Sequence, residues 1–164
     1  MTHQLMGFLA SSAVVASGLV AGVFLAFSDL VMNSLAKATR PGGIEAMQVI
    51  NRQVYRSVFL VLLMGMAPFS ALLTALAYVH APGPAVAWLA IGSGLYGLGV
   101  VVITVLCNVP MNLRLDSMDP NAVASEGYWR KYVSRWTRWN HVRVCAAAGA
   151  TVCFLAGCLA LVQG

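Results

Sequence analysis

The sequence predicts an all-α integral membrane protein, an up-and-down bundle of four transmembrane helices. Of its 164 residues, 60% are hydrophobic and only 9% are charged, whereas a soluble domain carries about 25% charged residues. The mean hydropathy of the chain is +0.80. Its apolar residues gather into four long windows and its basic residues into two connections. Composition, window length and charge placement therefore favour the same fold class.

Each apolar window is long enough to cross the hydrocarbon core of a bilayer, which needs about 20 residues of helix. The four windows are Leu5–Met32, Val54–Val79, Val86–Val109 and Val142–Val162. Little sequence remains outside them, so residues 1–164 are expected to form a single membrane domain. We do not expect the first window to be a cleaved signal peptide, because residues 1–6 contain no lysine or arginine.

Helical extensions are predicted before the second and fourth windows. Apolar residues recur every three or four positions across Ile44–Arg56, which predicts an amphipathic helix there. A second extension begins at Tyr128 and runs directly into the fourth window. The connection between the second and third windows, HAPGPA from His80, is a short turn punctuated by proline and glycine.

The placement of basic residues predicts the orientation of the bundle. All ten lie in or beside the two long connections: Lys37, Arg40, Arg52, Arg56, Arg114, Arg130, Lys131, Arg135, Arg138 and Arg143. Because basic loops stay in the cytoplasm, both connections are predicted to be cytoplasmic and both termini to lie outside. The net charge of +5 then belongs to the membrane surface. A nucleic-acid partner is not expected.

Small residues recur at four-residue intervals in the first and fourth windows. Gly18 and Gly22 make a GxxxG step, and Gly149, Cys153 and Gly157 repeat the spacing. Such faces allow membrane helices to approach closely. They could hold one bundle together or form the seam of a homo-oligomer, and the sequence leaves both open.

The third window ends in an unusually polar stretch, LCNVPMNLRL. Asn108 and Asn112 are four residues apart and so share a helix face. Pro110 between them cannot donate a backbone hydrogen bond and crowds the carbonyl of Leu106. Amides in hydrocarbon are expected to face the bundle interior or water. The stretch is therefore either the wall of a site or a helix cap at the membrane interface.

Polar residues also mark the other ends on the predicted cytoplasmic side. Asp29 and Asn33 close the first window, and Asn51 and Arg56 stand before the second. We group Asp29 with the candidate catalytic residues, and Asn33, Asn51 and Arg56 with the candidate substrate-binding residues.

The segment before the fourth window combines tryptophans with polar residues. Trp136 and Trp139 belong to an aromatic stripe that could line a site or form an interfacial aromatic belt. Asn140, His141 and Arg143 lead into an otherwise uncharged helix. His141 is a candidate proton acceptor. Arg143 requires a carboxylate or an anionic ligand, and we predict an ion pair with Asp29.

No metal site is predicted from the spacing of ligand residues. His141 is the only histidine at the predicted cytoplasmic end, which argues against a bis-histidine haem or a multi-histidine copper centre in one chain. The four cysteines form no CxxC motif, and we expect them to pack as small apolar residues.

Several motifs together resemble the anthrone oxygenase-like family of small four-helix membrane proteins. They are GLVAGVFLAFSDLVMNSLAK, AMQVINR, NVPMN and RWTRWNHVR, and the likeness runs from about Leu9 to Cys158. The resemblance implies an integral membrane protein, expected in a bacterial inner membrane. It also implies a membrane-embedded monooxygenase of small hydrophobic aromatic substrates of the anthrone or polyketide type.

The resemblance also implies roles for the polar residues. His141 would remove a proton from the substrate, Arg143 would stabilise the resulting anion, and the electron-rich carbanion would reduce dioxygen, the co-substrate. Asn108, Asn112 and Asn140 would donate hydrogen bonds to the developing oxyanion. Trp136 and Trp139 would form a flat wall. Such chemistry requires no cofactor, and haem, flavin or metal remain options.

The residues alone leave two other functions open. The same polar end could belong to a membrane binding or accessory protein that holds a lipid, a quinone or a small hydrophobic metabolite. A transporter is disfavoured, because the opposite half of the bundle has no polar residues to line a second gate.

Overall fold

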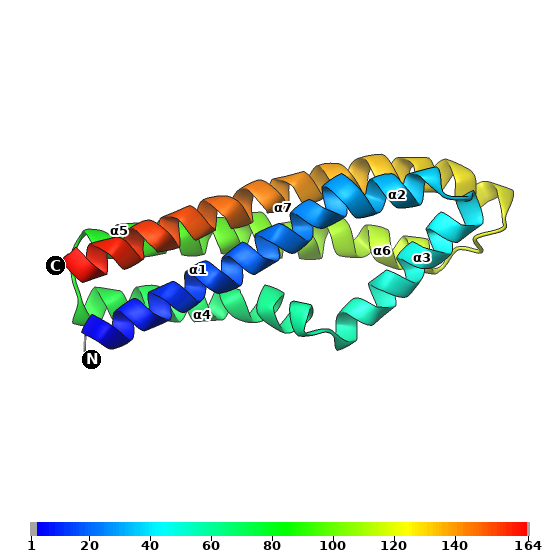
Figure 1. Cartoon of the computed structure of the whole chain (residues 1–164). Helices are drawn as coiled ribbons and strands as arrows, with labels where there is room; N and C mark the ends of the chain where they lie inside the picture. The colour runs from blue at the N-terminus through cyan, green and yellow to red at the C-terminus, as the bar shows by residue number, and fades with distance from the viewer. Residues whose placement is uncertain (1–2, 164) are drawn as a thin grey trace.

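The computed structural model describes residues 3–163, and the regular structure within them is entirely helical. Four long helical runs lie side by side in one elongated bundle (Figure 1). Each run is long and apolar enough to span a membrane: they are Gln4–Lys37, Val58–His80, Pro84–Asp116 and Val123–Val162. The predicted all-α class with four membrane helices is therefore confirmed.

The first run joins three helical segments without a loop. It consists of α1 (His3–Ala26), the π-helical turn η1 (Phe27–Val31) and α2 (Met32–Lys37). A π-helical turn within an α-helix is rare and is found frequently at functional sites.

The third run also contains π-helical structure, in two segments, the first of which is longer than η1. It consists of α5 (Pro84–Gly94), η3 (Leu95–Val102), η4 (Thr104–Asn108) and α6 (Val109–Asp116). Pro110 does not end the helix. It lies in the first turn of α6, where a missing backbone N–H costs least. The segment directly before it is the π-helical η4.

Both helical extensions are present, with shifted boundaries. The first is α3 (Arg40–Gln53) followed by the 3-10 turn η2 (Val54–Arg56). It begins four residues before the predicted Ile44, because Pro41 and the two glycines after it form its first turn. The second membrane helix, α4 (Val58–His80), begins after Ser57, whose Oγ accepts a hydrogen bond from the backbone N–H of Leu60 at 3.2 Å.

The fourth run is one unbroken helix, α7 (Val123–Gln163). It therefore begins well before the hydropathy window at Val142. The preceding segment is too polar for that window, but it contains no proline that would break the helix. The predicted extension and membrane helix are thus one continuous element.

Small residues bring the helices into close contact in the half of the bundle that holds the termini. A Cβ atom placed on Gly92 would lie 2.7 Å from Cε1 of Phe154, and one on Gly157 would lie 2.9 Å from Cδ2 of Leu89. In the GxxxG step, Gly18 faces Thr151, whereas Gly22 has open space around its Cα. The small-residue faces thus serve packing within this chain at Gly92, Gly157 and Gly18.

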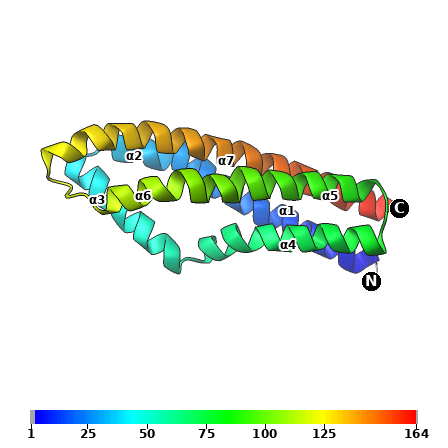
Figure 2. The same ribbon diagram turned by 180° about the vertical axis from the view of Figure 1, so that it is seen from behind.

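In the opposite half of the bundle, the helices pack around a separate hydrophobic cluster of large side chains. α3 runs obliquely from the end of α2 to the start of α4 and lies close to α6 (Figures 1 and 2). Beneath it the buried members of the cluster are Met32, Ile44, Met47, Leu115, Trp129, Tyr132 and Trp136. Two of its members, Met47 and Trp136, also line a cavity.

Candidate functional site

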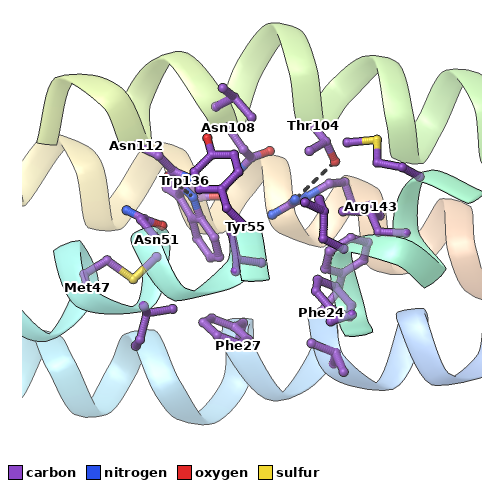
Figure 3. A pocket seen from close by; sticks show the side chains of 18 residues that line it. Phe24, Phe27, Met47, Asn51, Tyr55, Thr104, Asn108, Asn112, Trp136 and Arg143 are labelled. Atoms are coloured by element: carbon purple, nitrogen blue, oxygen red, sulfur yellow. Dashed lines mark hydrogen bonds between the residues drawn. The ribbon is translucent and has the colours of Figure 1, made fainter. Parts of the chain in front are cut away.

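A cavity of about 140 Å³ lies where α3 and the start of α4 meet the other three runs (Figure 3). Its wall takes residues from all four membrane runs and from α3. Most of the wall is apolar or aromatic. The polar exceptions are Asn51, Tyr55, Thr104, Asn108, Asn112 and Arg143, with the indole of Trp136 beside them.

Arg143 is a buried cation at this cavity. Only 5% of the residue is exposed. Its guanidinium lies between two aromatic rings, with Cζ 4.3 Å from the centroid of Phe24 and 5.3 Å from that of Trp136. Nη1 donates to Thr104 Oγ1 at 3.2 Å, and Nη2 donates to Asn140 Oδ1 at 2.5 Å. These contacts hold the side chain in one place without neutralising it.

The predicted ion pair between Asp29 and Arg143 is wrong. Asp29 lies in η1 with its residue exposed, and it takes part in none of the ion pairs found within residues 3–163. Arg143 takes part in none of them either. A buried charge without a partner is costly, so the cation at this cavity is suited to an anionic ligand.

Asn140 connects Arg143 to the first helical run. It is fully buried, and its Nδ2 donates to the carbonyl of Phe24 at 2.6 Å and to Ser28 Oγ at 2.5 Å. Both acceptors lie at the junction of α1 and η1. The remaining oxygen of the amide accepts from Arg143. Asn140 therefore positions the guanidinium and does not line the cavity itself.

Asn108 lines the cavity and keeps one unpaired atom. Its Nδ2 donates to the carbonyl of Trp136 at 3.3 Å, but its buried Oδ1 has no hydrogen-bond partner. The Nε of Arg143 is also buried and unpaired. Because buried polar groups are nearly always hydrogen-bonded, an unpaired acceptor and an unpaired donor on two residues that line the same cavity favour a polar ligand there.

Asn112 fixes the aromatic wall of the cavity. Its Oδ1 accepts from Tyr132 Oη at 2.7 Å and from Trp136 Nε1 at 2.9 Å. Asn51 on α3 donates from Nδ2 to the same Tyr132 oxygen at 3.5 Å. Tyr132 and Trp136 stack with ring centroids 6.2 Å apart. This chain of hydrogen bonds holds the indole plane and joins α3 to α6 and α7.

The structure thus brings together six of the eleven predicted site residues. Asn51, Asn108, Asn112, Trp136 and Arg143 line the cavity, and Asn140 supports Arg143. The other five are exposed and do not line it: Asp29, Asn33, Arg56, Trp139 and His141. The position of His141 gives no support to its predicted role as the base.

The phase of the helix explains why His141 and Trp139 lie outside. The buried face of α7 passes through Trp136, Asn140 and Arg143, at spacings of four and three. Both Trp139 and Asn140 are predicted from the sequence to contribute to the site, but adjacent residues of a helix cannot share one face. Trp139 is 38% exposed, and His141 turns away in the other direction around the helix.

Several residues of the cavity wall were not predicted from the sequence. One of them, Thr104, could have been found from its spacing. Thr104 precedes Asn108 by four residues, as Asn108 precedes Asn112, so the polar face of the third run could have been extended by one turn. Phe24, Phe27, Tyr55 and Phe59 also line the cavity. They are indistinguishable in the sequence from lipid-facing aromatic residues.

Comparison with known families identifies the family of this chain. A sequence model described as anthrone oxygenase matches residues 52–153. The chain belongs to the anthrone oxygenase family. The matched segment contains most of the residues that line the cavity, from Val54 on η2 to Arg143 on α7. No curated protein matches the chain, and no solved structure does. Within residues 3–163, no group of three or more His, Cys, Asp or Glu residues is arranged to hold a metal ion.

Proposed function

We propose that this protein oxidises a hydroxylated anthrone-type aromatic substrate with dioxygen, and that the cavity at Arg143 binds the substrate as its enolate anion. Membership of the anthrone oxygenase family supports the substrate class. The observation that carries the proposal is the buried Arg143 cation with aromatic neighbours and without a carboxylate. An aromatic anion complements both features.

The reaction requires no oxidant other than dioxygen. Loss of a proton from the CH₂ group of the anthrone gives a carbanion whose negative charge is delocalised onto the carbonyl oxygen. The carbanion transfers its electrons to dioxygen and forms a C–O bond, which gives a hydroperoxide after protonation. Loss of water then breaks the O–O bond and leaves a second carbonyl. The balance is one anthrone and one dioxygen to one anthraquinone and one water.

Arg143 supplies the electrostatic part of this catalysis. Its unpaired Nε–H would donate to the enolate oxygen, where the negative charge develops after proton loss. The unpaired Oδ1 of Asn108 would accept from a ring hydroxyl of the substrate. Because neither His141 nor a carboxylate lines the cavity, we assign the proton to water at the mouth beside the exposed Tyr55.

The size of the cavity constrains how the substrate would lie. An engineered protein cavity of about 150 Å³ holds one benzene molecule, so the cavity of about 140 Å³ has room for about one ring. The ring that carries the anion would pack against Trp136. The remaining rings would extend past Tyr55 at the edge of the cavity.

The test is turnover of a hydroxyanthrone by the purified protein in lipid nanodiscs. We expect oxygen uptake and quinone formation in equal amounts, faster than oxidation of the same anthrone without protein. Arg143→Met should lower kcat/KM by about 10²–10³-fold, the usual cost of removing one oxyanion-stabilising group. The matched control is Arg130→Met, because Arg130 lies on the same helix, is exposed and does not touch the cavity.

Two results would contradict the proposal. Wild-type turnover equal to the protein-free rate would exclude an oxygenase, and saturable binding without turnover would instead favour the binding-protein alternative. Equal losses in Arg143→Met and Arg130→Met would remove Arg143 from the site.

A further inference from the structure

A second hollow, separate from the cavity at Arg143, lies between α6 and the beginning of α7. It has a volume of about 660 Å³. Three basic residues line it, Arg114 on α6 and Lys131 and Arg135 on α7, and its remaining wall includes Met111 and Met118. It therefore combines positive charge with an apolar floor, and the proposed reaction does not use it.

The positive charge of this hollow is not neutralised by the protein. Within residues 3–163 the ion pairs are Arg40–Glu126, Arg52–Asp116 and Arg130–Glu126, so Glu126 and Asp116 are paired with other cations. Asp119 Oδ1 accepts from the backbone N–H of Asn121, and Asp119 does not line the hollow. Arg114, Lys131 and Arg135 belong to none of these pairs. Three exposed cations that converge on one hollow without carboxylates favour an anionic ligand.

Contacts made by Tyr128 fix one side of the hollow. The guanidinium Cζ of Arg114 lies 4.5 Å from the centroid of the Tyr128 ring. Tyr128 Oη donates to the carbonyl of Met111 at 3.1 Å, which joins α7 to α6 across the hollow. The cation–π contact orients Arg114 and leaves its charge available.

A smaller hollow continues this surface along α7 toward the apolar part of that helix. It has a volume of about 270 Å³ and is lined by Arg135, Arg138 and Trp139. Arg135 borders both hollows. One turn beyond Arg138 the same face becomes apolar, with Val142 exposed. The surface thus passes from cations through a tryptophan to an aliphatic residue, the order expected from headgroup level to hydrocarbon.

We propose that this basic hollow binds the phosphodiester headgroup of an anionic phospholipid. Arg114, Lys131 and Arg135 would contact the phosphate, and an acyl chain would run along α7 past Trp139 and Val142. Basic pockets at the membrane surface bind anionic headgroups through charge. The apolar continuation beside Trp139 favours a lipid over a free phosphate ion, which would gain nothing from it.

The test compares two triple variants that remove equal charge from the full-length protein in detergent. One is Arg114→Gln, Lys131→Gln and Arg135→Gln in the hollow, and the control is Lys37→Gln, Arg56→Gln and Arg130→Gln outside it. Native mass spectrometry with added phosphatidylglycerol or phosphatidylcholine measures retained lipid. The midpoint of thermal unfolding with each lipid, or with inorganic phosphate, measures stabilisation.

We expect the hollow variant to bind phosphatidylglycerol roughly tenfold or more weakly, and the control to change less than about threefold. Phosphatidylcholine should show no difference. Equal losses of phosphatidylglycerol binding in both variants would mean that only the total positive charge matters, which would overturn the proposal. Equal stabilisation by inorganic phosphate would also overturn it, because the site would then bind a free ion. Should the triple variant unfold in phosphatidylcholine, the double variant Lys131→Gln, Arg135→Gln, which keeps the Arg114–Tyr128 contact, decides by the same criteria.

Discussion

The two halves of the bundle differ in whether their buried polar groups are hydrogen-bonded. In the half that holds the termini, polar side chains are paired. Ser17 Oγ donates to the carbonyl of Ala13 at 2.7 Å and accepts from Thr151, and Thr74 and Ser93 share a hydrogen bond of 3.0 Å. In the half that holds α3, Asn108 Oδ1 and Arg143 Nε are buried and unpaired.

On the proposed function, this difference separates polar residues that hold helices together from Asn108 and Arg143, which would bind a ligand. Hydrogen bonds between membrane helices satisfy groups that hydrocarbon cannot, and the terminal half follows this rule with small residues at close helix contacts. The cavity half departs from it at Asn108 and Arg143, which line the cavity, and also at Arg40 Nε and Thr137 Oγ1, which belong to residues outside its wall. Substitutions should therefore change stability in the first half and activity in the second, with residues such as Asn140 affecting both.

Asn140→Leu should have the largest combined effect. It removes the hydrogen bonds to Phe24, Ser28 and Arg143 and leaves a buried carbonyl and the guanidinium short of partners. We expect a loss of about 1–3 kcal/mol in the free energy of unfolding, together with a fall in turnover of about tenfold or more because Arg143 is no longer positioned. Denaturation in detergent and the anthrone assay measure both. The exposed Asn33→Leu should change neither, and equal effects of the two variants would contradict the role of Asn140.

Gly92→Ala should lower stability without an effect on the site. The added Cβ would lie 2.7 Å from Phe154 Cε1, and overpacking of this kind costs about 1–3 kcal/mol. The control is Gly94→Ala, since a Cβ there meets nothing within 4 Å. Thermal unfolding should separate the two variants, whereas the kcat of folded protein should be the same in both. A loss of kcat specific to Gly92→Ala would show that the halves are coupled.

Arg143→Met should remove activity but leave stability unchanged or raise it by about 1 kcal/mol. The reason is that a methionine of similar length removes the cost of burying a cation without a carboxylate partner. This gain offsets the loss of the hydrogen bond that Asn140 Oδ1 accepts from Arg143. The unfolding midpoint in detergent measures the effect. A clear fall in that midpoint would mean that the guanidinium serves structure, as the hydroxyl groups do in the terminal half.

His141→Ala should have the smallest effect. The residue is exposed and lies outside the cavity wall, so turnover is expected to stay within about twofold of wild type, the change typical of a surface substitution. Steady-state kinetics in nanodiscs check this. A fall of tenfold or more would restore His141 as the base and require a different arrangement of α7 during the reaction.

Much of the fold could be predicted because hydrocarbon imposes a simple pattern. The four apolar windows and the charge deficit were sufficient for the class, and the turn at His80 was evident from its prolines. Helix boundaries were harder to predict where a segment is helical but not apolar. The stretch before Val142 is polar and aromatic yet helical, so α7 begins at Val123.

The site could be predicted only in part. A polar stretch of sequence indicates which end of a helix contributes to a site, but it does not show which of the adjacent residues face inward. Asn108 and Asn112 were found from their spacing, which Pro110 and the π-helical η4 did not disturb. On α7 both Trp139 and Asn140 are predicted to line the site, but one position separates the buried Asn140 from the exposed Trp139. The partner of Arg143 was assigned to Asp29 because that residue is the only acid in an apolar window, and sequence could not show that its side of η1 faces outward.

The most direct measurement concerns a ligand that mimics the product and does not react with oxygen. A hydroxyanthraquinone is titrated into wild-type protein and Arg143→Met, and its absorption spectrum is followed against pH. With wild type, the bound ligand should show the phenolate spectrum at a lower pH than the free ligand, because the Arg143 cation stabilises the anion; with Arg143→Met this shift should vanish. A bound ligand that keeps the neutral spectrum in wild type, or identical pH curves for the two proteins, would contradict the anion-binding cavity.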